Sequence, residues 1–320
     1  MDKGMELSCS GKQIKHLHKA VQILGRIGSD ILLEAVPERL VLRCISSSRS
    51  AFLAVTFNAT FFDKYDLYGT RLVHCGVLFK SLLAIFRTQR IQSLDLVLPF
   101  ESETLTARVH GSNGLTKVYG IVTMDSEILQ ATVDKDAFPT HITADAKELG
   151  RLLGSFQSNM EEVTVIAHPE RYHAPGQPPP KAFGLQSFVD AAKRDSENSL
   201  RTIMAVDTNA ALLEYRHASE DDADVTFNIK DFKTILALCE SMGANVSLHF
   251  ETPGSPIVVT PHFRGGGEEL DYDAELVLAS LMESQIQAEG QQPSQSRGGR
   301  PSEGGRYSFS THHAGGPSDA

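Results

Sequence analysis

Basic side chains recur at helical spacing in four segments of this 320-residue chain. Lysines and arginines three or four residues apart share one face of a helix, and such a face can neutralise the phosphates of a nucleic-acid backbone. The candidates for this role are Lys12, Lys15, Lys19, Arg26, Lys80, Arg87, Lys147, Arg151, Lys230 and Lys233. On any single helix such lysines are more commonly just solvated, and this alternative stays open.

The distribution of charge favours the phosphate interpretation although the net charge is −10. Acids are absent from residues 11–29 and 69–94, which carry several of the basic residues, and gather in other segments. No stacking aromatic and no Asn or Gln pair is placed among the lysines for base readout. The expected contact is therefore weak, sensitive to salt and independent of sequence.

Residue types that carry catalysis or bind metals lack a recognisable setting. The four cysteines, Cys9, Cys44, Cys75 and Cys239, form no CxxC pair, which fits a reducing intracellular compartment. The His16–His18 spacing is too short for one helix face, and no GxSxG or HExxH motif occurs. The glycines that follow Arg264 lack the strand and helix of a phosphate-binding loop. We expect no enzyme, no metal, no cofactor and, without a long apolar run, no membrane span.

Four amphipathic helices must position the basic residues. Their apolar stripes are Ile14, Leu17, Val21 and Leu24; Phe79, Leu82, Leu83 and Phe86; Leu149, Leu152, Leu153 and Phe156; and Phe232, Ile235, Leu236 and Cys239. Ser10 or Gly11 is expected to begin the first helix, Thr143 or Asp145 the third, and Gly243 to end the fourth. Many short alternating runs separated by turn residues predict antiparallel strands, so the fold class is α+β.

The order of helices and strands predicts an internal duplication. "FKSLLAIF" at residues 79–86 returns as "FKTILALC" at residues 232–239, which makes Lys80 and Lys233 predicted equivalents. We expect two domains at residues 1–120 and 138–281, joined by a connector at 121–137. Residues 168–184 are Pro-rich and predict a long loop, and residues 282–320 are rich in Gly, Ser, Gln and Pro and predict a disordered tail.

A duplicated unit of two helices and antiparallel strands, with basic helix faces, resembles the sliding DNA clamps. The stretch from Arg26 to Tyr65, with its "SSRSAF" turn and following "FF..Y", resembles the Rad-nine subunit family of the nine-one-one checkpoint clamp, as does "VSLHFETPGSPIVVT" at residues 246–260. The resemblance covers residues 5–281. It implies a clamp fold in which helices line a hole and sheets form the outside.

The resemblance also implies partners and a nuclear location. They are two paralogous clamp subunits in a heterotrimeric ring, double-stranded DNA, a clamp loader, and a checkpoint activator with BRCT repeats that binds a phosphorylated tail. Ser302 and Ser318 each precede an acid and are the candidate phosphorylation sites. Residues 104–122 and 181–188 are candidate edge strands for ring closure. The alternatives are a homotrimeric replicative clamp and a nuclease on the same scaffold.

Partner peptides of the resembled family bind an apolar pocket beneath the connector. The positions that match this pocket are Ile45, Ser50, Ile128, Leu129, Pro256 and Leu278. For Ile45 and Leu278, ordinary core packing is at least as good an explanation.

Overall fold

The computed structural model describes residues 3–69, 71–100, 102–126, 131, 133–169, 183–188, 202–206, 212–263 and 271–282. The expected tail beyond residue 282 and most of the Pro-rich loop lie outside these ranges. All structural statements below concern the described residues.

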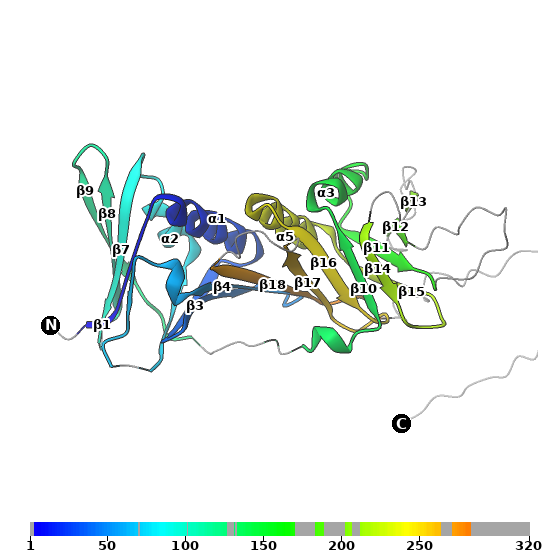
Figure 1. The fold of residues 1–320 in the computed structure, drawn as a ribbon, viewed down its shortest axis with the longest axis horizontal. Helices are drawn as coiled ribbons and strands as arrows, with labels where there is room; N and C mark the ends of the chain where they lie inside the picture. The colour runs from blue at the N-terminus through cyan, green and yellow to red at the C-terminus, as the bar shows by residue number, and fades with distance from the viewer. Residues whose placement is uncertain are drawn as a thin grey trace, which may run out of the picture.

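The order strand, helix, five strands, helix, three strands occurs twice along the chain (Figure 1). The first pass runs β1 (Lys3–Ser10), α1 (Gly11–Ile27), β2 (Asp30–Val36), β3 (Arg39–Ile45), β4 (Ala51–Asn58), β5 (Lys64–Asp66), β6 (Val73–Leu78), α2 (Phe79–Ile85), β7 (Ile91–Pro99), β8 (Thr104–Gly111) and β9 (Thr116–Val122). A short 3-10 turn, η1 (Ala59–Phe61), follows β4.

The second pass repeats this order after a connecting segment that holds the 3-10 turn η2 (Lys135–Ala137). It runs β10 (Thr140–Ala144), α3 (Ala146–Gly154), β11 (Glu162–Ala167), β12 (Phe183–Phe188), β13 (Ile203–Val206), β14 (Leu212–His217), β15 (Ala223–Asn228), α5 (Ile229–Met242), β16 (Asn245–Phe250), β17 (Ile257–His262) and β18 (Tyr272–Leu278). The predicted α+β class with duplicated order is confirmed.

The strands form three antiparallel sheets that connect the two passes. Their orders are β5-β1-β7-β8-β9, β14-β10-β16-β17-β18-β4-β3-β2-β6 and β13-β12-β11-β15. In the nine-stranded sheet, β18 from the second pass pairs with β4 from the first, from Tyr272 opposite Phe57 to Leu278 opposite Ala51. This junction makes one continuous sheet out of strands from both halves.

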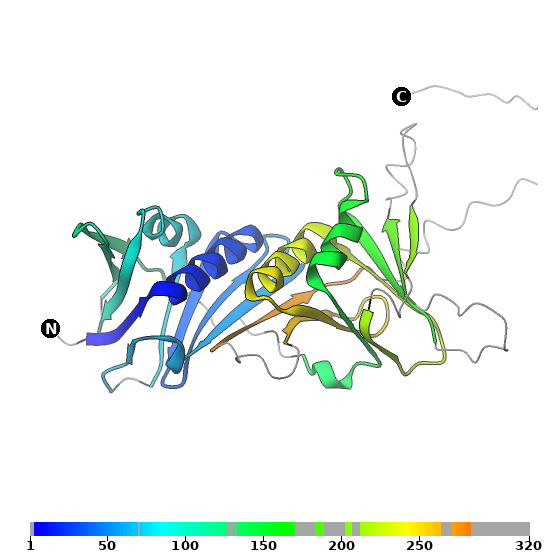
Figure 2. The ribbon, with the colours of Figure 1, turned by 45° about the horizontal axis from the view of Figure 1, so that its top comes forward.

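The four helices in the described part of the chain, α1, α2, α3 and α5, lie on the same side of the sheets (Figures 1 and 2). Helix α1 contacts both α2 and α5, and α5 contacts α3, so the helices form one layer. The main apolar core lies between this layer and the sheets and includes Leu17, Leu53, Phe57, Phe232 and Leu276. Burial of these side chains drives the packing, because each apolar Å² removed from water contributes about 25 cal/mol.

Local sequence explains where the helices begin and end. The Asp145 carboxylate accepts the backbone N–H groups of Lys147 and Glu148 at the start of α3, as predicted. Ser10 precedes α1, where its N–H donates to the Gln13 side chain at 2.8 Å. Helix α5 ends at Gly243, whose φ of +66° is in the left-handed region that glycine adopts readily.

Candidate nucleic-acid interface and connector-covered cavities

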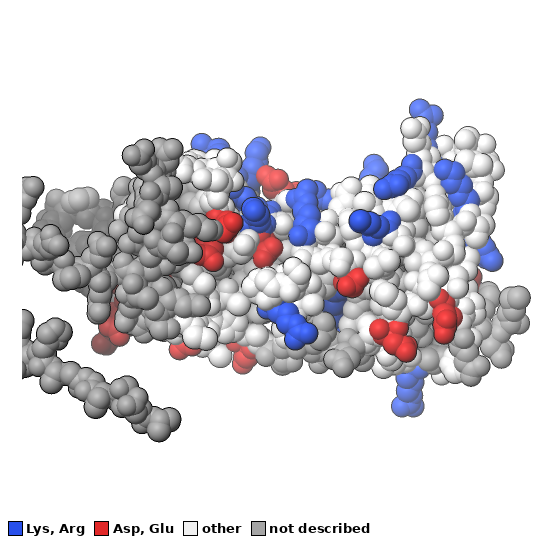
Figure 3. All heavy atoms as spheres, turned by 180° about the vertical axis from the view of Figure 1, so that it is seen from behind, with Lys and Arg blue, Asp and Glu red and all other residues white. Residues whose placement is uncertain are grey.

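The ten predicted basic residues all lie on the four helices or in the turn that follows α2. Nine of them are exposed, and Lys19 is half-buried. Lys and Arg side chains gather in the upper half of Figure 3, the side on which the helices lie in Figure 1. The helix layer therefore presents exposed basic side chains on one side of the molecule, and such a surface can attract a polyanion.

Acidic residues modify this surface at its α3 end. The guanidinium of Arg151 pairs with the Glu148 carboxylate at 2.7 Å, and both side chains are at least half exposed. An exposed pair of this kind contributes little to stability, but it reduces the net positive charge that Arg151 offers. The basic surface is therefore less compensated along α1 and α2, where neither helix carries an acid.

Two close contacts fix α2 against α1 and thereby set the position of Lys80. Gly25 of α1 leaves room for the ring of Phe79, which a methyl group at that position would overlap. The imidazole of His18 stacks on Phe86 with ring centroids 4.7 Å apart. Burial is the main reason that the pKa of His18 is lowered, so His18 serves this surface as a neutral ring at pH 7.

The two repeated octapeptides do not occupy the same position in their helices. Phe79 is the first residue of α2, whereas Phe232 is the fourth residue of α5. Counted from the strand-to-helix junction, Lys80 therefore corresponds to Lys230, and Lys233 lies about one turn further along. The predicted equivalence of Lys80 and Lys233 is wrong in register, although both lysines are exposed on the helix layer.

The sheet edges differ in part from those expected. β9 lies at the edge of its sheet, but β8 is paired on both sides. In the second half β12 is also paired on both sides, and β13 and β15 are the outer strands of the four-stranded sheet. The prediction for residues 181–188 is therefore wrong, because β13 continues the sheet beyond β12 through pairs such as Phe183 with Val206.

The described parts of the connecting segment contact the nine-stranded sheet at its β6 edge and on the face opposite the helices. Met124 exchanges both backbone hydrogen bonds with Gly76 of β6 at 2.8 Å. Further along, Ala131 and Val133 pack on a small apolar cluster of Phe52, Phe138, Val258 and Val277. This cluster is separate from the main core and holds the second part of the segment on the sheet.

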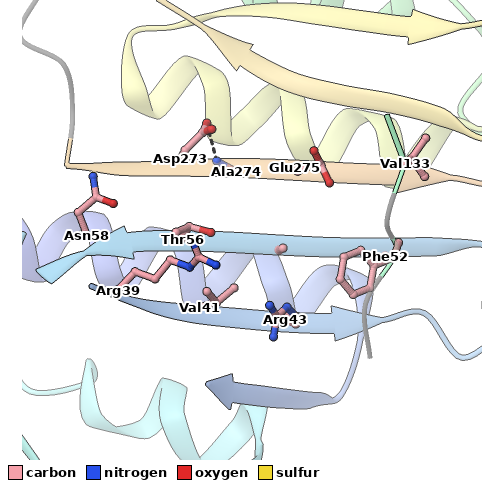
Figure 4. A pocket seen from close by; sticks show the side chains of 12 residues that line it. Arg39, Val41, Arg43, Phe52, Thr56, Asn58, Val133, Asp273, Ala274 and Glu275 are labelled. Carbon is pink, nitrogen blue, oxygen red and sulfur yellow. Dashed lines mark hydrogen bonds between the residues drawn. The ribbon is translucent and has the colours of Figure 1, made fainter. Parts of the chain in front are cut away.

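Two cavities lie on this face, separated by Arg43 and Phe52, which line both. One, of about 450 Å³, is lined by Ile45, Phe52, Met124 and Ser126 among others. The other, of about 510 Å³, is more polar, with Arg39, Asp273 and Glu275 around it and Val133 at one end, near Phe52 (Figure 4). Burial is the main reason that the pKa values of Asp273 and Glu275 are raised.

A buried ion pair stands at the boundary of these cavities. Arg43 and Glu34 are in contact at 2.7 Å, with side chains only 10% and 9% exposed. Removing one partner would leave the other charge buried and uncompensated. The hydroxyl of Ser126, in the connecting segment, is buried without a hydrogen-bond partner in the described part of the chain. The first cavity therefore combines an apolar floor with polar groups at its rim.

The structure places the predicted pocket residues as follows. Ile45 lines the 450 Å³ cavity, and the carbonyl of Ser50, in the turn after it, accepts the N–H of Ala279 at 2.8 Å. Leu278 is only 1% exposed and belongs to the main core, as the packing alternative predicts. Pro256 is half-buried and precedes β17. Ile128 and Leu129 lie outside the described residues, as do Ser302 and Ser318.

Sequence reasoning missed Phe52, Arg43 and Met124 as cavity-lining residues. Alternation along β4 carries a signal for Phe52, because its neighbours Ala51 and Leu53 face the main core and Phe52 must face the other side. No local pattern identifies Met124, because its position depends on pairing with Gly76 of β6.

The four cysteines are buried, and burial raises their pKa values, to about 12 for Cys9 and about 11 for Cys75. A thiol with so high a pKa is a poor nucleophile at pH 7. Across the described ranges, the helices are too short or too polar to cross a bilayer.

Solved structures of the same fold include the PCNA of Thermococcus kodakaraensis and that of Entamoeba histolytica. Both superpose with a TM-score of 0.63, at 14% and 12% identity, over 86% and 87% of this chain and 99% of theirs. A PCNA2–PCNA3 complex from Sulfolobus tokodaii matches with a TM-score of 0.62 at 14% identity, over 86% of this chain and 99% of that one. The fold is therefore that of the PCNA clamps.

The family model described as Rad9 matches residues 17–281, and the chain belongs to the Rad9 family. Similar proteins include the "Cell cycle checkpoint control protein Rad9" of Drosophila melanogaster, 24% identical over 256 residues, and the "DNA repair protein rad9" of Schizosaccharomyces pombe, 22% identical over 324 residues. The matches cover 80% and 88% of this chain, and 53% and 72% of those proteins. The chain thus spans about half the length of the fruit-fly relative.

Proposed function

We propose that the chain is one subunit of a heterotrimeric checkpoint clamp that encircles double-stranded DNA at sites of damage and recruits signalling and repair proteins. The names of its relatives, a checkpoint control protein and a DNA repair protein, support the checkpoint role. A clamp of this kind catalyses no reaction. It stays on DNA because its closed ring surrounds the duplex. The proposed role places the protein in the nucleus, with a clamp loader as a further partner.

The β4–β18 junction is the observation that carries this proposal. β9 is the last strand of the first half, as β18 is the last strand of the second half. β4 is the third strand after α1, and β13 is the third strand after α3. β9 and β13 each pair on one side only in the described sheets. The same antiparallel junction can therefore form between chains, with β9 of one subunit against the β13 position of the next.

The side chains of these two strands suit burial at such a junction. Val118 and Val122 of β9 are 62% and 70% exposed, and Ile203 of β13 is 59% exposed. β-branched apolar residues on an open strand edge are uncommon unless something covers them, because an uncovered edge promotes aggregation. Strand addition at both edges would cover these residues and close a ring.

In such a ring the helix layer would face the DNA. Its exposed basic residues would meet phosphates on any sequence, with the α1 and α2 residues contributing most because no acid neutralises them on their own helices. The weakness of the contact is useful, since a clamp must remain free to slide. The ten basic residues are therefore proposed to face the DNA inside the ring, with Lys230 as the equivalent of Lys80.

The cavities beside the connecting segment are the proposed docking sites for partner peptides. Ile45 and Phe52 would contact an apolar anchor of the peptide in the 450 Å³ cavity, while Ser50 and Pro256 remain proposed rim residues. Ile128 and Leu129, in the connecting segment, remain proposed residues of the partner-peptide pocket. The tail, with Ser302 and Ser318, is the proposed phosphorylated segment for the BRCT-repeat activator.

Co-purification tests this proposal. The chain, expressed with candidate clamp subunits of the same cell, should elute as a single complex that contains one copy of each of three different chains. Sizing of the chain alone separates the alternatives. A stable ring of three identical chains would replace the proposal with a replicative-type clamp, and metal-dependent cleavage of DNA, abolished by one carboxylate substitution, would support the nuclease alternative.

A further inference from the structure

Two histidines that are 108 residues apart in the sequence meet on the outer face of the nine-stranded sheet. His141 of β10 and His249 of β16 are direct cross-strand partners. Their Nδ1 atoms lie 3.0 Å apart, and their ring planes are nearly perpendicular, at 82°. They lie beside the Phe138 and Val258 cluster, where the connecting segment joins β10.

The hydrogen bonds of the pair define where its protons are. Nε2 of His141 is 2.8 Å from the carbonyl oxygen of Phe138, which can only accept, so Nε2 carries a proton and, in the neutral ring, Nδ1 of His141 is bare. Nδ1 of His249 must then donate to Nδ1 of His141. The proton between the two Nδ1 atoms therefore forms a hydrogen bond where two lone pairs would otherwise repel each other.

The imidazole of His249 is neutral at physiological pH. Burial, followed by the nearby His141 and Lys135, lowers the pKa of His249 to about 4, against a smaller opposing effect of Asp136. Neutral imidazole is the form that binds metal ions. An ordinary exposed histidine is partly protonated near pH 6.5, so His249 is better prepared than most histidines to act as a ligand.

We propose that His141 and His249 form a binding site for a divalent transition-metal ion of the zinc and copper class. The ion would bind both Nδ1 atoms from one side of the line that joins them, displace the proton between them, and require the two rings to turn so that both lone pairs point at the ion. Zinc–nitrogen bonds of about 2.0–2.1 Å at angles of roughly 90° to 110° separate the two nitrogens by roughly 2.8 to 3.4 Å. The 3.0 Å separation lies inside this range.

The surroundings of the pair match those of metal-binding histidines. Such histidines usually donate their second ring N–H to a carbonyl or carboxylate, as Nε2 of His141 does to Phe138. On binding, the proton of His249 moves from Nδ1 to Nε2 of the same ring, so no proton is lost. No three His, Cys, Asp or Glu side chains converge in the described ranges, so water completes the coordination shell.

Metal binding at this position would act on the connecting segment. A metal on Nδ1 makes the opposite N–H of an imidazole a stronger donor, and that N–H of His141 holds the carbonyl of Phe138, directly after η2. Phe138 also packs in the cluster under Val133. The ion would therefore tighten the point at which the segment that borders both cavities is attached to the second half.

Titration of the full chain with Zn²⁺, and with Cu²⁺ as a spectroscopic probe, tests the proposal. We expect one equivalent of Cu²⁺ to give an electron paramagnetic resonance spectrum with two coordinated nitrogens. His249→Asn should lower Zn²⁺ affinity more than about tenfold. The matched control His312→Asn/His313→Asn removes the adjacent pair in the tail and should leave binding at the site unchanged.

A second measurement keeps the test independent of the folding of the variants. In the unsubstituted chain, Zn²⁺ should shift the Nδ1 resonances of two histidines in long-range ¹H–¹⁵N spectra and raise Tm, whereas Mg²⁺ should do neither. Retained binding in His249→Asn, loss of binding in the tail variant, or unshifted Nδ1 resonances would overturn the site and leave the pair as a hydrogen-bonded structural contact. None of these outcomes depends on whether the chain forms a ring.

Discussion

The hydroxyl of Tyr272 is hydrogen-bonded to Nδ1 of His16, with the two atoms 2.9 Å apart. Burial raises the pKa of Tyr272 to about 12, so the hydroxyl remains protonated at pH 7. The Tyr272 ring also stacks on Phe57 of β4, with centroids 5.4 Å apart. A strand of the second half is thus attached to the exposed basic helix of the first half by a side chain as well as by the β4–β18 backbone.

Replacing Tyr272 by Phe removes this hydrogen bond and keeps the ring stacking. We expect the free energy of unfolding to fall by about 1 kcal/mol, the usual net contribution of one hydrogen bond. Urea unfolding followed by circular dichroism measures the change. Tyr119→Phe is a matched control, because its hydroxyl contacts Thr88 within the first half. Only Tyr272→Phe should alter the NMR signals of both α1 and β18. If Tyr119→Phe altered these signals to the same extent, the result would contradict the proposed link.

Phe52 anchors the connecting segment to the outer face of the sheet. Truncation to Ala removes the centre of the small cluster that holds Ala131 and Val133, and we expect a loss of roughly 3–5 kcal/mol in unfolding free energy. Limited proteolysis should cut the segment faster than in the parent chain. Phe100→Ala is the control, because Phe100 is 60% exposed and its truncation should change neither quantity. An unchanged cleavage rate in Phe52→Ala would show that the segment is held elsewhere.

The lowered pKa of His249 predicts how stability depends on pH. The unfolded chain binds a proton at His249 below about pH 6.5, whereas the folded chain resists protonation until about pH 4. Stability should therefore fall as pH decreases between these values, by up to roughly 2 kcal/mol at pH 5, and not change further from this group below pH 4. Unfolding titrations at pH 7 and pH 5 measure the difference. His249→Leu should flatten this dependence, and an equally steep dependence in the variant would assign it to other groups.

Charge on the outer edge of β9 should block assembly with partner subunits. Val118→Glu with Val122→Glu would place two carboxylates where the proposed junction buries apolar side chains, without touching the core of the chain. We expect the complex to dissociate on size-exclusion chromatography while the chain itself unfolds at an unchanged temperature. Leu213→Glu on the edge strand β14 is the control, since Leu213 is also exposed, at 45%. Intact assembly in the double variant would exclude β9 as the contact.

Local sequence patterns predicted the parts of the fold that depend on short-range physics. Apolar stripes located the four helices, Asp145 and Gly243 bounded two of them correctly, and the repeated order of elements predicted the duplication. The offset between Lys80 and Lys233 was not accessible in this way, because it depends on where each strand passes into its helix. A helix period is the same at any starting residue, so the octapeptides alone could not reveal a shift of one turn.

Contacts between distant segments were beyond the reach of sequence patterns. β12 and β13 both have the composition of a strand, and only the pairing of Phe183 with Val206 determines which one is at the edge. The His141–His249 pair depends on the register of β10 against β16, and a shift of one residue would turn the side chains to opposite faces. Leu278 resembled a pocket residue, but alternation along β18 places it in the main core.

Retention on circular DNA tests the central claim, that the helix layer holds DNA inside a closed ring. The assembled complex should stay on nicked circular plasmid and leave when the plasmid is linearised. Lys80→Glu with Lys233→Glu should reduce retention and lower the salt slope by about one for each phosphate that the complex no longer neutralises. The control Arg39→Glu with Arg216→Glu makes the same charge change on strands β3 and β14 of the nine-stranded sheet and should be retained like the parent. Equal retention of all three complexes, or no release on linearisation, would contradict the account.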